Sequence, residues 1–310
     1  MRLGIMTNSR PEKLSIDQLI AHLARIENDG FDHAWLIHLP YSGFDALTAI
    51  ALASRHTQRI MFGTSVVSIY AYHPLMLAQH ALTAQAATNG RLILGLGLSH
   101  QVVVENAMGL SYEKPARRMR EYLSIVRALI DTGRVEFKGE VYNVNAELNV
   151  IGSSPCPIVI AALAPQMLRL AGEMADGTVT WLAGRRTLET HIIPRITAAA
   201  KECGRPQPRI VAGLPVAVAD DPRKARDDAT AMLQRYDALP NYRRLLDMEG
   251  AAHAGDTLIT GNEAEVEKQL RELAAIGVTD FIASIFPADE DAAKSTKRTW
   301  TLLRNLVGQL

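Results

Sequence analysis

Short apolar runs alternate with longer segments of helical periodicity along most of the chain. The first apolar run covers residues 3–6, and residues 15–28 then carry Leu19, Ile20, Leu23 and Ile26 at helical spacing. The same strand-then-helix rhythm recurs to the C-terminus. Strands are predicted at residues 3–6, 34–37, 60–69, 92–96, 158–161, 177–181, 210–218 and 279–285, and helices at 15–28, 45–55, 74–88, 115–130, 166–174, 187–203, 222–236, 263–276 and 291–306.

This alternation predicts an α/β fold with a parallel sheet and right-handed crossovers. Eight strand–helix units favour a closed (β/α)8 TIM barrel over an open doubly wound sheet. The 310 residues suit one such barrel with insertion regions, and no shift in composition marks a linker, so residues 1–310 are expected to form a single domain. Two stretches break the rhythm: residues 135–142 predict a small hairpin that turns at Lys138-Gly139, and residues 237–260 read as irregular.

Composition excludes several classes of partner. Lys plus Arg and Asp plus Glu both number 33, so nothing indicates a basic surface for nucleic acid or for a membrane. No stretch is apolar enough to span a bilayer, and the start at Met1 shows no signal-peptide pattern, so we expect a cytoplasmic protein. Cys156 and Cys203 belong to no Cys-x-x-Cys pair, and the nine histidines form no His-x-x-x-His arrangement, so no metal site is expected.

The predicted strand 60–69 begins apolar and turns polar at Ser65 and Ser68. In a barrel the C-terminal ends of the strands open into the active site. Small hydroxylated residues there leave room for a planar ring to lie against the backbone. A packed strand whose hydroxyls bond to neighbouring backbone is the alternative.

A glycine-rich strand end follows at Gly95, Gly97, Leu98 and Ser99. Glycines at such a position let a ligand approach the backbone closely, although glycines at a barrel corner are the alternative. A dinucleotide-binding fingerprint is excluded because His100 stands where it needs a third Gly or Ala.

Two further strand ends carry candidate binding residues. The small residues before Pro165 expose backbone N–H groups at a helix start, which favours a phosphate, although an ordinary strand–helix turn fits equally. Trp181 could stack on a ring or wall a pocket, with Arg185 and Arg186 in reach of a phosphate or acidic tail. A core tryptophan and two solvated arginines are the alternative.

His38 and His100 each follow a predicted strand and are expected to point into the barrel mouth. A neutral imidazole there could donate to a carbonyl or relay a proton near neutral pH. Both histidines are therefore the candidate catalytic residues, with a structural role as the alternative.

Taken together, these segments resemble the luciferase-like flavin-dependent oxidoreductases, and more closely their coenzyme F420-dependent branch. The likeness runs in order over nearly the whole chain. It rests on Gly30-Phe31-Asp32, Gly63-Thr64-Ser65-Val66, His73-Pro74, Ala78-Gln79, Gly90-Arg91, residues 94–97, residues 135–142, Leu168-Arg169-Leu170-Ala171-Gly172, Ala175-Asp176-Gly177 and Gly277-Val278-Thr279.

The resemblance implies a usually homodimeric barrel whose cofactor ring lies in the mouth against the third strand. Members often have a non-proline cis peptide there that bulges behind the ring, and by position it joins Ser65 and Val66. Carried over by position, the cofactor residues are Ser65, Val66 and Ser68 behind the ring, Gly97, Leu98 and Ser99 near its side chain, and Ala162, Leu163 and Ala164 near its phosphate, with Trp181 at the wall.

The chain also departs from these relatives. Sugar and alcohol dehydrogenases of the family carry Asp-His where His38-Leu39 stands and Glu where His100 stands, and their glycine-rich turn is Leu163-Ala164 here. Their substrate specificity is therefore not carried over.

The resemblance implies an F420-dependent oxidoreductase that moves a hydride between the deazaflavin and a small organic substrate. The alternatives are an FMN-dependent monooxygenase fed by a separate reductase, and a non-catalytic flavin-binding protein. Loop variation sets specificity in barrels, and residues 237–260, which include Tyr242 and follow Tyr236, are expected to form a lid over the pocket.

Overall fold

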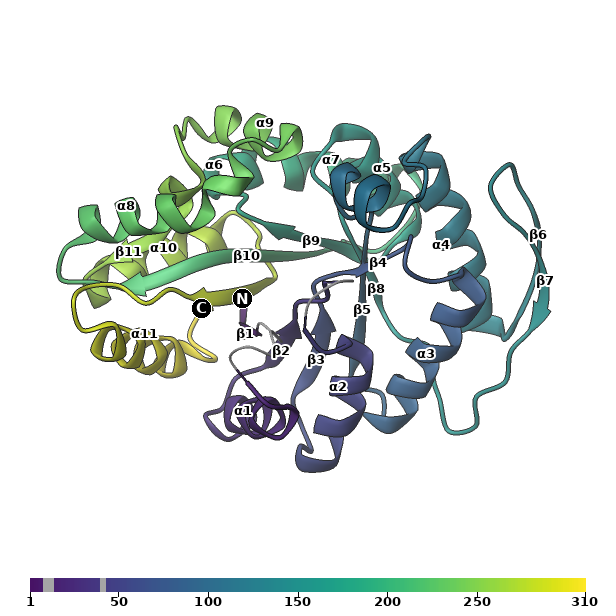
Figure 1. The fold of residues 1–310 in the computed structure, drawn as a ribbon, viewed down its shortest axis with the longest axis horizontal. Coiled ribbons are helices and arrows are strands. Elements are labelled where there is room, and N and C mark those ends of the chain that lie inside the picture. Colours follow the sequence, from purple (N-terminus) through teal and green to yellow (C-terminus); the bar gives the residue numbers. More distant parts are fainter. Residues whose placement is uncertain (8–13, 40–42) are drawn as a thin grey trace.

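The structure is a computed structural model that describes residues 1–7, 14–39 and 43–310. Within these residues, eight parallel strands close into a barrel, with β10 pairing with β9 on one side and β12 on the other, and β12 with β1 (Figure 1). The predicted (β/α)8 barrel is confirmed. Its strands are β1 (Arg2–Thr7), β2 (His33–Leu36), β3 (Met61–Thr64), β5 (Leu92–Gly97), β8 (Ile158–Ala161), β9 (Gly177–Trp181), β10 (Arg209–Val218) and β12 (Asp280–Ile285).

Helices surround the barrel on its outer side (Figure 1). The first helix shows why they form where they do. The Ser15 hydroxyl accepts from the Gln18 backbone N–H, and the Gln18 side chain accepts from the Ser15 backbone N–H. Leu19, Leu23 and Ile26 form the buried face of this helix. The helices are α1 (Ile16–Asn28), α2 (Ala46–Ala53), α3 (Pro74–Ala87), α4 (Pro115–Thr132), α5 (Pro165–Met174), α6 (Arg185–Thr187), α7 (Ile193–Glu202), α8 (Pro222–Leu233), α9 (Pro240–Glu249), α10 (Glu263–Ala275) and α11 (Ala292–Leu306).

Three expectations about local structure need correction. The predicted strand 60–69 is interrupted, because β3 ends at Thr64 and a two-residue strand, β4 (Val67–Ser68), follows. The hairpin is larger than expected, with β6 (Arg134–Lys138) and β7 (Asn143–Glu147) pairing around a turn at residues 139–142. The segment expected to be irregular contains α9 and the short strand β11 (Ile259–Gly261), which pairs with the end of β10.

The barrel interior is filled by a compact apolar cluster. Alternate residues of each strand point inwards, as the pleat requires. The cluster consists of Met6, Trp35, Ile93, Val159, Val179, Val211 and Ile282, with Ile37, Met61, Val66 and Trp181 packed against it.

A buried polar network closes the barrel at the N-terminal ends of its strands. The Asp280 carboxylate accepts from Arg209 at 2.7 and 2.6 Å and pairs with His33 Nε2 at 3.1 Å. Because Trp35 Nε1 donates to His33 Nδ1 at 3.1 Å, the neutral His33 ring carries its proton on Nε2. Burial alone would raise the pKa of Asp280, but the hydrogen bonds from His33 and Arg209 outweigh it and hold that pKa well below its usual value. The network lies opposite the barrel mouth and therefore serves stability.

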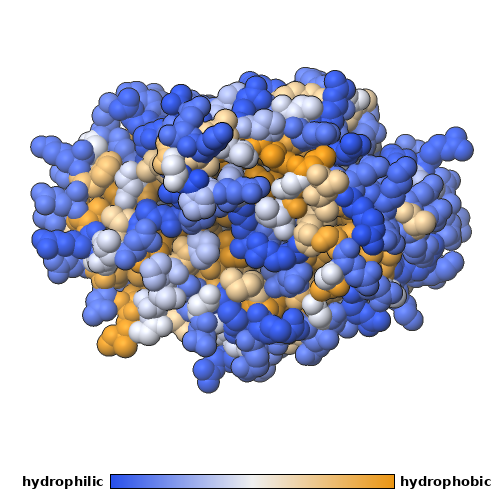
Figure 2. Space-filling model, turned by 180° about the vertical axis from the view of Figure 1, so that it is seen from behind, coloured by the Kyte–Doolittle hydropathy of each residue, from blue (hydrophilic) through white to orange (hydrophobic). Residues whose placement is uncertain are grey.

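Figure 2 shows hydrophilic residues over most of one face, with hydrophobic residues in several separate patches among them. No helix in the described part of the chain is both long and apolar enough to cross a membrane.

Candidate cofactor site at the barrel mouth

A one-residue bulge interrupts the third barrel strand at the predicted cofactor position. Gly63 pairs with Ile93 and Val67 pairs with Leu96, so residues 64–66 of one strand lie opposite residues 94 and 95 of the other. The Ser65–Val66 peptide within this bulge is cis, which confirms the expectation drawn from the family resemblance.

Thr64 holds the two strands together where the ladder is interrupted. Its hydroxyl donates to the Gly95 carbonyl at 2.9 Å and accepts from the Gly95 N–H at 2.8 Å. The side chain thereby replaces the two backbone hydrogen bonds that the bulge removes. The bulge is consequently anchored without a regular strand pair.

The glycines of β5 are needed because the bulge lies against them. A Cβ on Gly95 would lie 1.8 Å from the Thr64 carbonyl oxygen, and a Cβ on Gly97 would lie 2.4 Å from Val66 Cγ2. Val66 therefore covers Gly97, and the two strand ends make one continuous surface. Ser65 and Val66 are half-buried at this surface, whereas Ser68 is buried, pairs with Gly97 in the sheet and accepts from the Tyr70 N–H at 3.3 Å.

Leu98 and Ser99 continue from Gly97 and are half-buried. Ser99 has φ of +59°, a left-handed conformation that turns the chain sharply away from the strand. His100 follows and its carbonyl accepts from the N–H groups of Val103 and Val104. The turn therefore places Leu98, Ser99 and His100 at the rim of the mouth.

The next strand end leads into a helix with an open N-terminus. Ala162 is buried, Leu163 and Ala164 are half-buried, and Ala164 is the N-cap of α5 without a side chain that caps it. The Leu163 carbonyl accepts from His191 Nε2 at 2.8 Å, which fixes the turn. The first N–H groups of α5 can therefore receive an anionic group such as a phosphate.

Aromatic side chains from three separate segments meet over the mouth. The ring centroid of Trp181, at the end of β9, lies 6.5 Å from that of Tyr236, and Tyr236 lies 4.8 Å from Tyr242 on α9. Tyr242 in turn lies 6.0 Å from His100. The expected lid is therefore partly helical, and it rests on the β5 and β9 strand ends.

Two groups at the mouth have properties that suit a ligand. Trp181 Nε1 is buried without a hydrogen-bond partner in the described structure, an arrangement that is costly unless a ligand supplies an acceptor. Burial, with Arg235 acting in the same direction, lowers the pKa of His100 below its usual value. The imidazole is consequently neutral at pH 7, with one donor and one acceptor nitrogen.

His38 occupies a different environment from the one expected. Ile37 packs on the barrel interior, and His38 turns to the other side, with Nδ1 at 3.6 Å from Asp45 Oδ2 and its ring 6.1 Å from that of Tyr72. Tyr72 donates to the same Asp45 oxygen at 3.0 Å. Burial lowers the pKa of His38, although Asp45 opposes that shift. His38 is thus a neutral, buried ring, and the structure does not bring it together with His100.

Within the described residues, no three His, Cys, Asp or Glu side chains lie close enough together to hold a metal ion. Neither Cys156 nor Cys203 forms a disulfide there.

The fold and this strand-end site define a class of protein, and comparison with known families agrees. Residues 1–282 match the model of the luciferase-like monooxygenase family. The chain therefore belongs to that family.

The relatives of this chain include a 5,10-methylenetetrahydromethanopterin reductase and an F420-dependent dehydrogenase. The chain is 28% identical over 308 residues to the 5,10-methylenetetrahydromethanopterin reductase of Methanopyrus kandleri. The match covers 93% of this chain and 82% of the relative. It is 25% identical over 317 residues to the F420-dependent glucose-6-phosphate dehydrogenase of Intrasporangium calvum, covering 91% of this chain and 92% of the relative.

A solved structure with the same fold is the coenzyme F420-dependent tetrahydromethanopterin reductase from Methanopyrus kandleri. It superimposes with a TM-score of 0.80 at 22% identity and covers 99% of this chain and 98% of the other. The two chains therefore share the barrel fold over nearly their full lengths.

Proposed function

We propose that the chain is an F420-dependent oxidoreductase that transfers a hydride between the deazaflavin and a small organic substrate at the barrel mouth. The observation that carries the proposal is the bulge at Ser65 and Val66, with Val66 covering Gly97. It offers flat backbone on which a planar ring can lie. The F420-dependent relatives support the deazaflavin over other ring systems.

The residues of the mouth fit such a cofactor. Ser65, Val66 and Ser68 would lie behind the ring, and Gly97, Leu98 and Ser99 beside its side chain. The open start of α5, after Ala162, Leu163 and Ala164, would receive its phosphate, and the unpartnered Trp181 Nε1 would donate to the ring or the substrate. When bound, the deazaflavin supplies or accepts the hydride at C5.

His100 is the candidate for orienting the substrate. Its neutral ring stands at the rim beside Tyr242, so it can donate a hydrogen bond to a substrate carbonyl or exchange a proton with it. His38 would act beside Asp45, which lies 3.6 Å from its Nδ1 and accepts a hydrogen bond from the Tyr72 hydroxyl. Segment 236–242 would exclude water above the site.

The proposal extends to assembly and location. We propose that residues 1–310 act as one domain, as a homodimer in the cytoplasm, on a small-molecule substrate. The homodimer is carried over from the family resemblance. Light scattering at micromolar concentration tests the dimer, and a mass of 33.9 kDa would contradict it.

The second candidate function is an FMN-dependent monooxygenase, which the description of the family favours. Two assays separate the candidates. Reduced F420 should be oxidised in the presence of a panel of carbonyl and imine acceptors without consumption of oxygen. Oxygen uptake with reduced FMN and a partner reductase would instead establish the monooxygenase. If the protein binds cofactor but shows no turnover in either assay, it is a non-catalytic flavin-binding protein. Replacing His38 or His100 would then change no functional property.

A further inference from the structure

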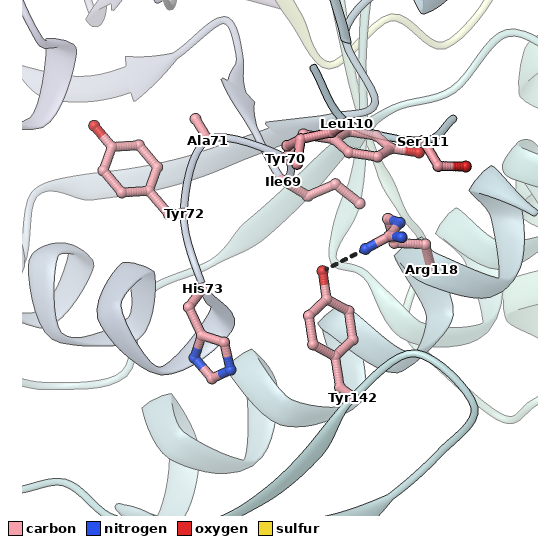
Figure 3. A pocket seen from close by; sticks show the side chains of 9 residues that line it. All are labelled: Ile69, Tyr70, Ala71, Tyr72, His73, Leu110, Ser111, Arg118 and Tyr142. Carbon is pink, nitrogen blue, oxygen red and sulfur yellow. Dashed lines mark hydrogen bonds between the residues drawn. The ribbon is translucent and has the colours of Figure 1, made fainter. Parts of the chain in front are cut away.

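A cavity lies beside the mouth, between the segment after β4, the loop before α4 and the β6–β7 turn. Its volume is about 290 Å³. Figure 3 shows the Arg118 guanidinium between the rings of Tyr70 and Tyr142. The polar and aromatic lining residues are Tyr70, Tyr72, His73, Ser111, Arg118 and Tyr142.

Arg118 has no negative partner among the residues that the structure describes. Its guanidinium carbon lies 5.0 Å from the Tyr70 ring centroid and 5.8 Å from that of Tyr142, and Nη1 donates to the Tyr142 hydroxyl at 3.4 Å. Nε is buried without a hydrogen-bond partner, and Arg118 forms no ion pair with any residue of the described ranges. Its neighbour Arg117, in contrast, pairs with Glu140. A half-buried guanidinium without a counter-charge is unfavourable unless a bound anion pairs with it.

Two other polar groups that line the cavity, the Tyr70 hydroxyl and the His73 ring, also present donors. The Tyr70 side chain is 9% exposed, and its hydroxyl has no hydrogen-bond partner in the part of the chain that the structure describes. Burial raises the pKa of Tyr70 to about 12, although Arg118 acts in the opposite direction, so the hydroxyl keeps its proton. His73 Nδ1 accepts from the Leu75 N–H, so the ring carries a proton on Nε2. No Asp or Glu lines the cavity.

The walls of the cavity are held in place independently of any ligand. The buried Glu121 carboxylate accepts from the N–H groups of residues 140, 141 and 142 at 3.0, 2.8 and 3.0 Å. Tyr142 then contacts Tyr122 and His73 edge to face, with ring centroids 5.8 and 6.0 Å apart. A site whose donors are fixed before binding loses little entropy when it binds.

We propose that this cavity binds an oxoanion, the carboxylate or phosphate group of a small molecule, which Arg118 and the Tyr70 hydroxyl hold together. A planar fork of N–H donors beside an O–H donor matches that geometry. The inference goes beyond the proposed function and does not depend on it. The anion has two possible sources, a free small molecule or the anionic end of a ligand that extends from the mouth, since Tyr70 lies two residues after Ser68.

Calorimetric titration of the whole protein with inorganic phosphate and with benzoate tests the site. The wild type should bind at least one of these anions saturably with one site per chain. Arg118→Met should weaken binding by roughly tenfold or more, because a charge-assisted hydrogen bond is lost. Tyr70→Phe, which removes one oxygen and leaves the packing intact, should weaken it severalfold. Arg117→Met, one residue away and on the surface, should bind as the wild type does.

A second arm distinguishes the sources. F420 and FMN are titrated with and without saturating phosphate or benzoate. Competition that disappears in Arg118→Met, or weaker cofactor binding in both Arg118→Met and Tyr70→Phe, assigns the site to the anionic end of the cofactor. Anion binding without competition assigns it to a separate small molecule. The proposal is overturned if the wild type binds neither anion saturably while both variants bind cofactor normally, or if Arg117→Met loses as much anion affinity as Arg118→Met.

Discussion

Val66 fills the space that a side chain on Gly97 would occupy: a Cβ built on Gly97 lies 2.4 Å from Val66 Cγ2. The two residues belong to neighbouring strand ends, and the one-residue bulge brings them together. Gly97 is therefore a requirement of the bulge, and the surface that both residues form is where the cofactor ring is proposed to lie.

Gly97→Ala should displace Val66 and weaken F420 binding, with a loss of stability of about 1–3 kcal/mol from overpacking. Val66→Ala removes the methyl groups that clash, so the double variant Gly97→Ala/Val66→Ala should regain part of the lost stability. Chemical denaturation and fluorescence titration of the four proteins measure both effects. Strictly additive losses would show that the two side chains do not compete for this space.

Thr64→Val should destabilise the fold by about 1–3 kcal/mol, because it leaves the Gly95 N–H and carbonyl without the hydroxyl that bonds them. The control is Thr83→Val on the exposed side of α3, whose hydroxyl bonds only to the carbonyl of Gln79 in the preceding turn. Urea denaturation compares the two. Equal effects of both substitutions would contradict the role assigned to Thr64 in holding the bulge.

Asp280→Asn should destabilise the protein by about 3–5 kcal/mol at neutral pH, since it leaves Arg209 buried without its counter-charge. The pKa of Asp280 is lowered in the folded state, so its contribution is present above the usual value near 3.8 and is lost as pH falls through the folded value. The stability difference between the two proteins should accordingly be constant from about pH 5 to 8 and shrink only in strong acid. A difference that already shrinks between pH 7 and 5 would contradict this assignment.

His100→Phe should lower kcat by about 10²-fold or more if the imidazole exchanges a proton with the substrate. Because its pKa is lowered, the neutral ring predominates above the usual value near 6.5, and activity should fall only when pH drops below the lowered value. The pH dependence of kcat/KM tests this, with His56→Phe, an exposed residue, as the control. A rate that rises on acidification through pH 6 would instead require the protonated imidazole.

The barrel was predictable because its signals are local and repeated. Each apolar run is flanked by a helix with its own start and stop residues, and pairing with the next strand follows from the parallel topology. The change from apolar to polar residues at Ser65 and the glycine at Gly97 also indicated strand ends, although a packed strand and a barrel corner fitted the same residues. Both are properties that a single segment reveals by itself.

The remaining features depend on contacts between distant segments. The partners of His38, Asp45 and Tyr72, come from separate loops, and nothing in the pattern around them indicates that they meet. The unpaired Arg118 is likewise visible only once the β6–β7 turn is in place.

Helix α9 is a different case, because a signal was present. Pro240 at its first position and Gly250, with φ of +80°, at its end are ordinary helix boundaries, and Leu245 and Leu246 supply the buried side. Ten residues bounded in this way predict a short helix, which the expectation of an irregular segment overlooked.

A side-by-side fluorescence titration of the purified protein with F420 and with FMN tests most directly whether a deazaflavin lies at the barrel mouth. We expect saturable binding of F420 with one site per chain, tighter than binding of FMN, and a marked loss of F420 affinity in Gly97→Ala. Binding of neither cofactor, or F420 affinity that is unchanged in Gly97→Ala, would contradict a deazaflavin ring lying on the surface that Val66 and Gly97 form.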